Sequence, residues 1–262
     1  MNKTCLVGYT GYVGSTLRKQ TEFEDVYNSS NIQDISGKAY DLVICAAAPA
    51  VKWKANQAPE EDLSNINSLI ACLKEVKANR FVLISTVDVY SEPVGVYEDT
   101  PIEAEKAEPY GRHRYFLEHF VTSNFEKHLI IRLPGLFGKG LKKNFIYDLI
   151  HNNALHLTHH KSQFQFYNMS NLWKDIQTAL SNHLTLVNFA TEPVSAEEIA
   201  DYALQLKFAN VTEKKPVFYD MKSRYASIFS KETSSSSSYT KTKKEVLHEI
   251  AEFIKEEKRL LL

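Results

Sequence analysis

The stretch LVGYTGYVGST, residues 6–16, decides the fold of this chain. Leu6 and Val7 end a short apolar run, and Gly8, Gly11 and Gly14 follow at intervals of three. The chain has only 9 glycines among 262 residues, so this gathering is not a matter of composition. In such a turn the first glycine permits a tight bend, the second lets backbone N–H groups approach a pyrophosphate, and the third lets a helix pack closely on a strand. The stretch therefore predicts a strand, an anion-binding turn and a helix; the alternative is a strand-to-helix turn without a ligand.

The position of these glycines, between a strand and a helix, is typical of dinucleotide binding. We expect Tyr12 and Val13, between the second and third glycines, to bind the cofactor as well, and the N-terminus of the helix to add partial positive charge for the phosphates. A carboxylate about 20 residues further on binds the ribose of NAD in this kind of fold. This chain has Asn28, Ser29 and Ser30 there, and neutral side chains tolerate a 2′-phosphate. We expect NADP or NAD as the cofactor, with NADP favoured.

The composition of the chain limits the classes of protein to which it can belong. The net charge is −1 with both signs well mixed, which predicts neither a nucleic-acid partner nor a membrane partner. The longest apolar run, residues 42–51, is about half of a membrane span. Cys5, Cys45 and Cys72 lie in apolar segments without a C-x-x-C motif, and no signal-peptide pattern precedes the first strand; we expect a cytoplasmic protein with reduced thiols.

The histidines of HLTHH (156–160) lack a matching set of carboxylates or cysteines, so we expect a polar loop there and no metal site.

Short apolar runs alternate with segments of helical period. Strands are predicted over 4–7, 40–47, 80–86, 128–132 and 186–190. Two helical faces are predicted between them: Leu63, Ile66, Ile70 and Leu73, and Phe116, Leu117, Phe120 and Val121. This alternation indicates an α/β protein with a Rossmann-type, doubly wound parallel sheet that binds ligands at the carboxyl ends of its strands.

The second half of the chain is more irregular. Helices are predicted over 144–150 and 172–180, and a loop over the serine run 234–238. Ser195 and Glu198 form a capping box before a helix with the apolar face Ile199, Tyr202, Ala203 and Leu206, and a closing helix has the face Val246, Ile250, Phe253 and Ile254. We expect an NAD(P)-binding domain over 1–140 and a small mixed substrate lobe over 141–262, some of whose elements return to the sheet domain.

A second group of motifs begins at the strand predicted over 80–86. FVLISTVDVY (81–90) contains the end of this strand, with hydroxyls at Ser85 and Thr86, and PYGRHRYFLEHF begins at Pro109. At this point the chain resembles the short-chain dehydrogenase/reductase family, in its extended, sugar-nucleotide branch. The similar pieces are GYTGYVGS, DLVICAAA, RFVLISTVDVY, YGRHRYFLE and IIRLPGLFG, in the order of the family and within residues 1–140. The short segment between Gly14 and Asp41 looks closer to dTDP-4-dehydrorhamnose reductases than to epimerases.

The resemblance implies a catalytic set. Thr86 polarises the substrate C–O group, Tyr110 is the general acid/base, and residue 114 holds the cofactor ribose and lowers the pKa of the tyrosine. The family has lysine at that last position and this chain has Arg114, which keeps the charge but does not release a proton. His113 points away from the face of Tyr110, so we expect a satisfied or solvated side chain.

The resemblance also implies binding residues. Ala46, Ala47 and Pro134 border the cofactor, while Lys143 and Asn144 contact the substrate, with Lys142 nearby. Phe164 stands where nucleotide-sugar epimerases carry the arginine for the diphosphate; Lys222 and Arg224 are candidates to replace it.

Two functions remain open. The first is an NAD(P)-dependent reductase, epimerase or dehydratase acting on a sugar, most simply a nucleotide sugar. For a dehydratase, Asp88 would share the strand face of Thr86; otherwise it is a loop charge past the strand. The second is a cofactor-binding sensor or scaffold without turnover, which Arg114 and the missing arginine favour. The resemblance further implies a homodimer through the helices after Glu61 and after Tyr110.

Overall fold

The structure is a computed structural model that describes residues 3–230 and 237–260. Contacts divide the chain into two compact units. The first comprises residues 1–92, 99–132 and 173–187, and the second comprises 93–98, 133–172 and 188–262. The chain thus leaves the first unit at Arg132, ahead of the expected boundary at residue 140, and later returns to it.

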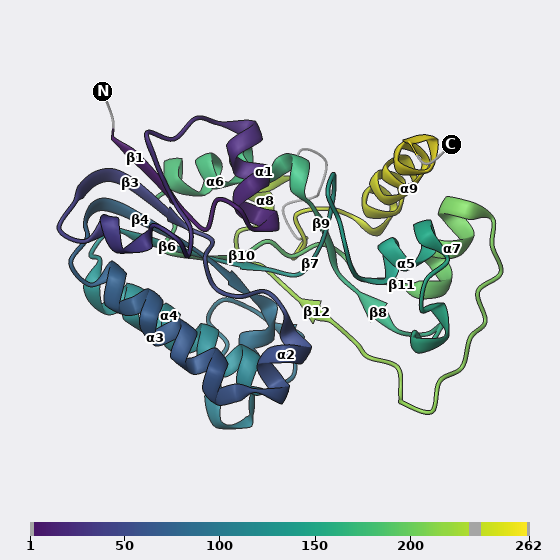
Figure 1. Ribbon diagram of the computed structural model, residues 1–262. Coiled ribbons are helices and arrows are strands. Elements are labelled where there is room, and N and C mark those ends of the chain that lie inside the picture. Colours follow the sequence, from purple (N-terminus) through teal and green to yellow (C-terminus); the bar gives the residue numbers. More distant parts are fainter. Residues whose placement is uncertain (1–2, 231–236, 261–262) are drawn as a thin grey trace. The chain divides into compact units, whose positions relative to one another are not determined.

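The first unit is built on a six-stranded sheet in the order β10-β6-β4-β3-β1-β2 (Figure 1). The strands are β1 (Thr4–Val7), β2 (Asp25–Tyr27), β3 (Ala39–Cys45), β4 (Lys77–Thr86), β6 (His128–Leu133) and β10 (Leu186–Asn188). The pairs β1–β2, β1–β3 and β3–β4 are parallel. The predicted strands are confirmed, and the sheet has the expected Rossmann-type order. The chain passes from β1 to β2 on one side and crosses to β3 on the other, so the strand order reverses where ligands bind in such sheets.

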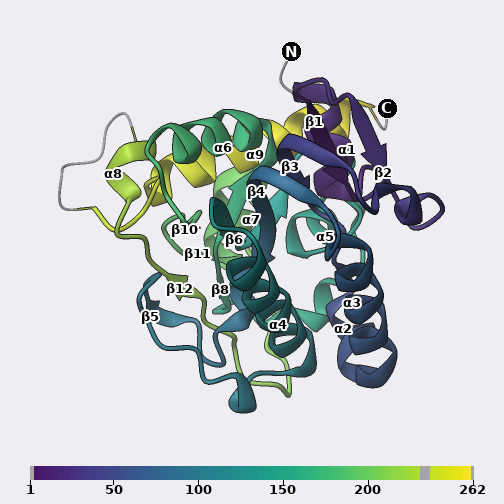
Figure 2. The same ribbon diagram turned by 90° about the vertical axis from the view of Figure 1, so that its left-hand side faces the viewer.

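Helices cover both faces of this sheet (Figure 2). One face carries α1 (Tyr12–Gln20) and α6 (Leu172–Ser181); the other carries α3 (Pro59–Leu73) and α4 (Pro109–Asn124), with the short α2 (Lys52–Gln57) before α3. Both predicted helical faces contribute to the core, where Ile66, Leu73, Leu117 and Val121 are buried.

One residue of the predicted α4 face lies elsewhere. Phe116 is 45% exposed, because the buried stripe of α4 runs through Arg114, Leu117, Glu118 and Val121. Two charged residues therefore occupy core positions that a pattern of apolar residues does not reveal. Glu118 forms a buried ion pair with Arg132 and accepts a hydrogen bond from Ser85.

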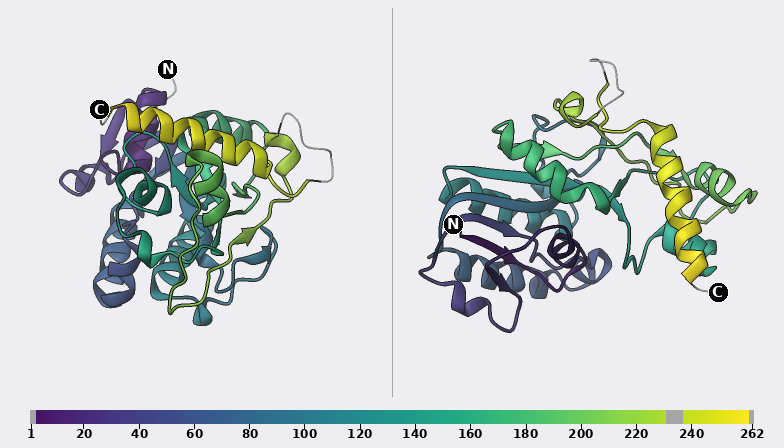
Figure 3. Two further views of the ribbon diagram at one scale, coloured as in Figure 1. Left: turned by 90° about the vertical axis from the view of Figure 1, so that its right-hand side faces the viewer. Right: turned by 90° about the horizontal axis from the view of Figure 1, so that it is seen from above.

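The second unit has a core of its own, formed by α5 (Phe145–His151), α7 (Ala196–Leu204) and α9 (Lys243–Leu260) (Figure 3). The predicted face of the closing helix is confirmed, since Val246, Ile250, Phe253 and Ile254 are all buried. Its strands form three pairs among the described residues: β5 (Val94–Val96) with β12 (Asp220–Met221), β7 (Gly135–Phe137) with β9 (Phe166–Asn168), and β8 (Gln163–Phe164) with β11 (Val194–Ser195). A short α8 (Ala226–Phe229) completes the unit.

The capping box that opens α7 is confirmed, with Ser195 and Glu198 bonding each other's backbone N–H. The predicted apolar face of this helix is wrong in two places. Gln205 adopts a left-handed conformation with φ 51° that ends the helix, so Leu206 lies beyond it and is exposed. Tyr202 is also exposed, which leaves Ile199 and Ala200 as the buried contacts.

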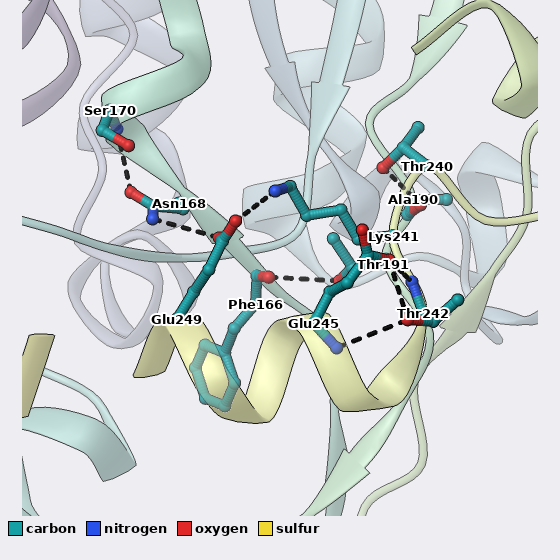
Figure 4. Close-up of polar contacts among 10 residues, drawn as sticks. All are labelled: Phe166, Asn168, Ser170, Ala190, Thr191, Thr240, Lys241, Thr242, Glu245 and Glu249. Atoms are coloured by element: carbon teal, nitrogen blue, oxygen red, sulfur yellow. Dashed lines mark hydrogen bonds and ion pairs between the residues drawn. The ribbon is translucent and has the colours of Figure 1, made fainter. Parts of the chain in front are cut away.

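Polar contacts fix the start of α9 (Figure 4). Thr242 and Glu245 form a second capping box, with the Thr242 N–H 2.7 Å from Glu245 Oε2 and the Glu245 N–H 3.3 Å from Thr242 Oγ1. Lys241 pairs with Glu249, which also accepts from Asn168 Nδ2 at 3.0 Å. These contacts tie α9 to β9 inside the second unit. The loop predicted over 234–238 lies, for residues 234–236, outside the described residues.

In the described part of the chain, no helix combines the length and the apolar character needed to cross a membrane.

Candidate functional site

The glycine turn joins β1 to α1, as predicted. Gly8 has φ 89°, and a Cβ there would lie 2.5 Å from the Ala46 carbonyl oxygen; a Cβ on Gly14 would overlap the carbonyl of Gly8. The fold itself therefore requires these two glycines. A Cβ on Gly11 would meet only the Gly8 carbonyl, at 3.4 Å. Because the protein does not fill this space, and because α1 starts at Tyr12 without a side-chain cap, the turn fits a group that hydrogen-bonds the helix N-terminus, such as a pyrophosphate.

The segment after β2 lies beside this turn. Asn28 Nδ2 donates to Tyr9 Oη at 3.3 Å, and Asn28 Oδ1 accepts from the Ser30 N–H at 2.9 Å. The guanidinium of Arg18, on α1, lies over the Tyr9 ring at 5.1 Å. Ser29 is exposed. An arginine that the sequence did not single out thus contacts the tyrosine that holds Asn28.

Thr86 and Tyr110, predicted to act together, are in contact. Thr86 is the last residue of β4, and its hydroxyl lies beside the phenol of Tyr110, in the first turn of α4, whose pKa it lowers. The helix comes this close because Gly111 has no side chain; a Cβ there would overlap the carbonyl oxygen of Asp88. The approach of α4 to the end of β4 therefore builds this part of the site.

Asp88 lies just past the strand, the second of its two expected placements. It belongs to a single 3-10 turn, Val87–Val89, and its N–H donates to Thr86 Oγ1 at 3.2 Å. Its carboxylate still reaches the site: Oδ2 is 3.5 Å from Thr86 Oγ1, and Oδ1 is 2.7 Å from Lys52 Nζ.

The groups around Tyr110 shift its pKa in opposite directions. Burial raises the pKa of this half-buried phenol above its usual value, and the Asp88 carboxylate raises it further. The charges of Arg114 and Lys52 and the hydrogen bond with Thr86 act in the opposite direction without cancelling the rise. The expected lowering of the tyrosine pKa by residue 114 is thus present as a contribution but does not prevail in this structure.

Arg114 is engaged inside the protein. It is 2% exposed and forms an ion pair with both carboxylate oxygens of Asp62, one of them at 2.9 Å. It also donates to the carbonyls of Pro49 and Tyr110, and its guanidinium lies 3.9 Å from the centre of the Tyr110 ring. Burial disfavours the Asp62 carboxylate, but hydrogen bonds from Arg114 and His113 outweigh this and lower its pKa. His113, with Nδ1 2.8 Å from Asp62, is a satisfied buried histidine, as expected.

A single segment between β3 and the first turn of α3 supplies most partners of the Tyr110 turn. Besides the carbonyl of Pro49 and the carboxylate of Asp62, it provides Lys52 and Asn56, whose Oδ1 accepts from the Tyr110 N–H at 3.0 Å. None of these residues stands in a motif that the sequence reveals. Asp62 occurs in the first turn of a helix, where acidic residues are common for reasons of helix stability alone.

Three predicted residues belong to the second unit. Pro134 is buried, and Lys143 is exposed, as is its neighbour Lys142. Asn144, with φ 105°, caps α5: its Oδ1 accepts from the N–H groups of Ile146 and Tyr147, and its Nδ2 donates to the Leu136 carbonyl at 2.8 Å. Its contact with a substrate stays a prediction.

The proposed replacements for the missing arginine are also in this unit. Phe164 packs against Phe145 and Phe166, so its position is part of an aromatic core. Lys222 pairs with Asp220 at 3.6 Å, and the guanidinium of Arg224 lies 4.1 Å from the Tyr97 ring centre. His160, in the predicted polar loop, bonds Glu197 at 2.6 Å; within residues 3–230 and 237–260, no three His, Cys, Asp or Glu side chains gather as a metal site.

Comparisons with known proteins agree with this geometry. The model of the NAD dependent epimerase/dehydratase family matches residues 16–173. Among solved structures, a dTDP-4-dehydrorhamnose reductase from Clostridium acetobutylicum superposes with a TM-score of 0.71 at 18% identity, covering 97% of this chain and 98% of that chain. The reductase of the same name from Bacillus anthracis, in complex with NADP, gives 0.71 at 17% identity over 98% and 99% of the two chains.

A UDP-N-acetylglucosamine 4-epimerase from Methanobrevibacter ruminantium, in complex with UDP-N-acetylmuramic acid, gives 0.69 at 13% identity and covers 97% of each chain. At these identities the likeness concerns the fold. No curated protein sequence matches the chain.

Proposed function

Because the chain belongs to the NAD dependent epimerase/dehydratase family, we propose that it transfers a hydride between a nicotinamide dinucleotide and a carbon of a nucleotide-linked sugar. The observation that carries the proposal is the contact between Thr86 and Tyr110 in the same unit as the glycine turn. Gly8 follows β1 and Thr86 ends β4, so both lie at the carboxyl edge of one sheet, where parallel sheets of this kind bind ligands.

Each group of residues would have a role of its own in the reaction. When bound, the cofactor supplies the nicotinamide carbon that gives or takes the hydride. The glycine turn and the first turn of α1, with Gly8, Gly11 and Gly14, would hold the pyrophosphate. Thr86 would hydrogen-bond the reacting C–O group, and Tyr110 would give or take its proton. Arg114 would keep the Tyr110 ring in place, because its guanidinium stacks on that ring.

For the cofactor we favour NADP. A 2′-phosphate needs hydrogen-bond donors and a cation at the end of β2, without a carboxylate. The donors come from Asn28, Ser29 and Ser30. The cation is Arg18, whose guanidinium lies over the ring of Tyr9, and Tyr9 is hydrogen-bonded to Asn28. An arginine fork suits a phosphate dianion better than a ribose hydroxyl.

A homodimer and a reducing compartment complete the proposal. Phe116 is exposed on α4, which packs beside α3, and an apolar side chain there suits a helical interface between two copies. Cys5, Cys45 and Cys72 are free and buried, and burial raises the pKa of Cys45 to about 11. Free, buried thiols are what we expect of a cytoplasmic protein.

The test is a titration of the protein with NADPH and with NADH, followed by nicotinamide fluorescence, and then an assay of hydride transfer with nucleotide sugars. We expect tighter binding of NADPH, and turnover that the variant Tyr110→Phe loses by at least about 100-fold while it still binds cofactor. Binding without turnover on any nucleotide sugar would favour the sensor or scaffold function. Failure of the folded protein to bind either cofactor would overturn both.

A further inference from the structure

We propose that Lys52 and Asp88 form a charge pair that tunes Tyr110 as an acid and base, in addition to the fixed charge of Arg114. The inference rests on the proposed function, because such tuning matters only if Tyr110 transfers a proton. Lys52 and Asp88 are positioning residues in this scheme and act on the substrate through Tyr110 and Thr86.

The contacts form a continuous series that leads to Tyr110. Lys52 Nζ lies 2.7 Å from Asp88 Oδ1, and the other oxygen of that carboxylate lies 3.5 Å from Thr86 Oγ1. The backbone of Asp88 packs against Gly111, next to Tyr110 in α4, and the Thr86 hydroxyl lowers the pKa of the Tyr110 phenol. The series joins α2, the turn after β4 and the first turn of α4, three elements of the first unit.

Arg114 also lies against the Tyr110 ring, but its guanidinium is held in place by other partners. Both oxygens of Asp62 and two backbone carbonyls accept its N–H groups, and the group is almost wholly buried. Its charge is therefore balanced by a carboxylate in a fixed geometry, and arginine does not exchange its proton near neutral pH. His113 faces the same carboxylate and not the phenol.

Lys52 is less confined than Arg114, although it too is paired with a carboxylate. Its side chain is 42% exposed, on a flexible stem. Asp88 is closer to the interior, with a side chain 18% exposed. The two charges act on the Tyr110 pKa with opposite signs: the carboxylate raises it and the ammonium lowers it. The charged groups around the phenol are thus Arg114 on α4, with Asp62 on α3 behind it, Lys52 on α2 and Asp88 on the 3-10 turn.

Because Lys52 and Asp88 shift the Tyr110 pKa in opposite directions, replacing each of them in turn gives a specific test of the proposal. A fluorinated tyrosine that ionises at lower pH than tyrosine is incorporated at position 110, and fluorine NMR follows its ionisation without interference from the other 13 tyrosines. We expect Lys52→Met to raise the pKa of this residue and Asp88→Asn to lower it, each by roughly one pH unit. The double variant should return close to the parent, and Lys52→Arg should leave the pKa at its parent value.

The matched control is Lys54→Met, which removes a cation from the same helix. Lys54 is exposed and pairs with Glu61, away from Asp88, so its variant should titrate like the parent. Shifts of Lys52→Met and Asp88→Asn in the same direction, or no shift in either, would overturn the charge pair. The NMR readout is independent of turnover.

Two further readouts separate this inference from the proposed function. In an active enzyme the pH profile of kcat/KM should move in the same directions as the fluorine titration, with little change in cofactor affinity. If the parent binds neither NADPH nor NADH, the proposed function fails while the titration still decides whether the charge pair acts on Tyr110.

Discussion

At the scale of single residues, the most consequential contact is the one between Arg114 and Asp62. A buried carboxylate costs free energy unless it is paired and hydrogen-bonded, and Asp62 receives hydrogen bonds from both Arg114 and His113. The arginine at this position is a buried cation that is paired with Asp62 of α3 and stacked on the Tyr110 ring.

The lowered pKa of Asp62 makes a prediction about acid stability. Its ordinary value is 3.8, and the folded-state value lies below this, so the stabilisation is complete above about pH 4 and is lost as the pH falls through the folded-state pKa. Asp62→Asn should lower the free energy of unfolding by about 3 to 5 kcal/mol at neutral pH, because Arg114 is left buried without a counter-charge. The stability of this variant should also fall less steeply below pH 4 than that of the parent.

Urea unfolding followed by circular dichroism at a series of pH values measures both effects. The control is Glu61→Gln, on the same helix, whose exposed pair with Lys54 should contribute less than about 1 kcal/mol. Equal losses in the two variants would mean that the buried pair has no special role.

At the scale of elements, the site depends on how closely α4 approaches the end of β4. Gly111 allows the helix backbone to lie against the carbonyl of Asp88, and this contact places Tyr110 beside Thr86. The same turn of α4 is fixed from its other side by Asn56, whose side chain accepts from the Tyr110 N–H. A shift of the helix would separate the two reacting hydroxyls before it disturbed the sheet.

We expect Gly111→Ala to push α4 away from the 3-10 turn. The methyl group has no room, and overpacking of this kind costs about 1 to 3 kcal/mol of stability. Hydride transfer should fall by more than 10-fold at a temperature where the variant is still folded, since misplacement by about 1 Å is enough to lose that much. NADPH binding should change little, because the glycine turn between β1 and α1 is untouched.

Steady-state kinetics and cofactor fluorescence on the same preparation check this. Thr122→Ala, on the exposed side of α4, is the control, because it removes only a hydrogen bond to the His119 carbonyl of the same helix. If Gly111→Ala keeps the parent rate, close approach of the helix does not position Tyr110.

At the scale of the whole molecule, the proposed dimer accounts for the exposure of Phe116. The buried stripe of α4 is occupied in part by Arg114 and Glu118, so this phenylalanine turns outward, 45% exposed. An aromatic side chain on a long outer helix is the kind of residue that anchors an interface between proteins.

We therefore expect Phe116→Glu to shift the protein from dimer to monomer, since a charge in the centre of an apolar interface is desolvated without a partner. Sedimentation velocity at several concentrations measures the change. Val211→Glu is the control, because Val211 is 71% exposed in the second unit. A monomeric parent, or a Phe116→Glu variant that remains dimeric, would remove this interface from the proposal.

The sequence by itself determined the features that depend on neighbours along the chain. The glycine spacing after β1, the apolar periods of α3, α4 and α9, and the Ser195–Glu198 capping box are all local patterns, and each is present in the structure. The pairing of Thr86 with Tyr110 was also expected, because the family resemblance named both.

Only the tertiary structure decided the surroundings of that pair. Lys52 and Asp88 are 36 positions apart, and Asp62 and Arg114 are 52 apart, so no periodicity connects them. Whether a charged side chain faces a ligand or a buried partner depends on which carboxylates the fold brings within hydrogen-bond distance and on how far water is excluded there. For this reason the sequence could name Arg114 as a cation of the site, while the packing of α3 against α4 determined which group it holds.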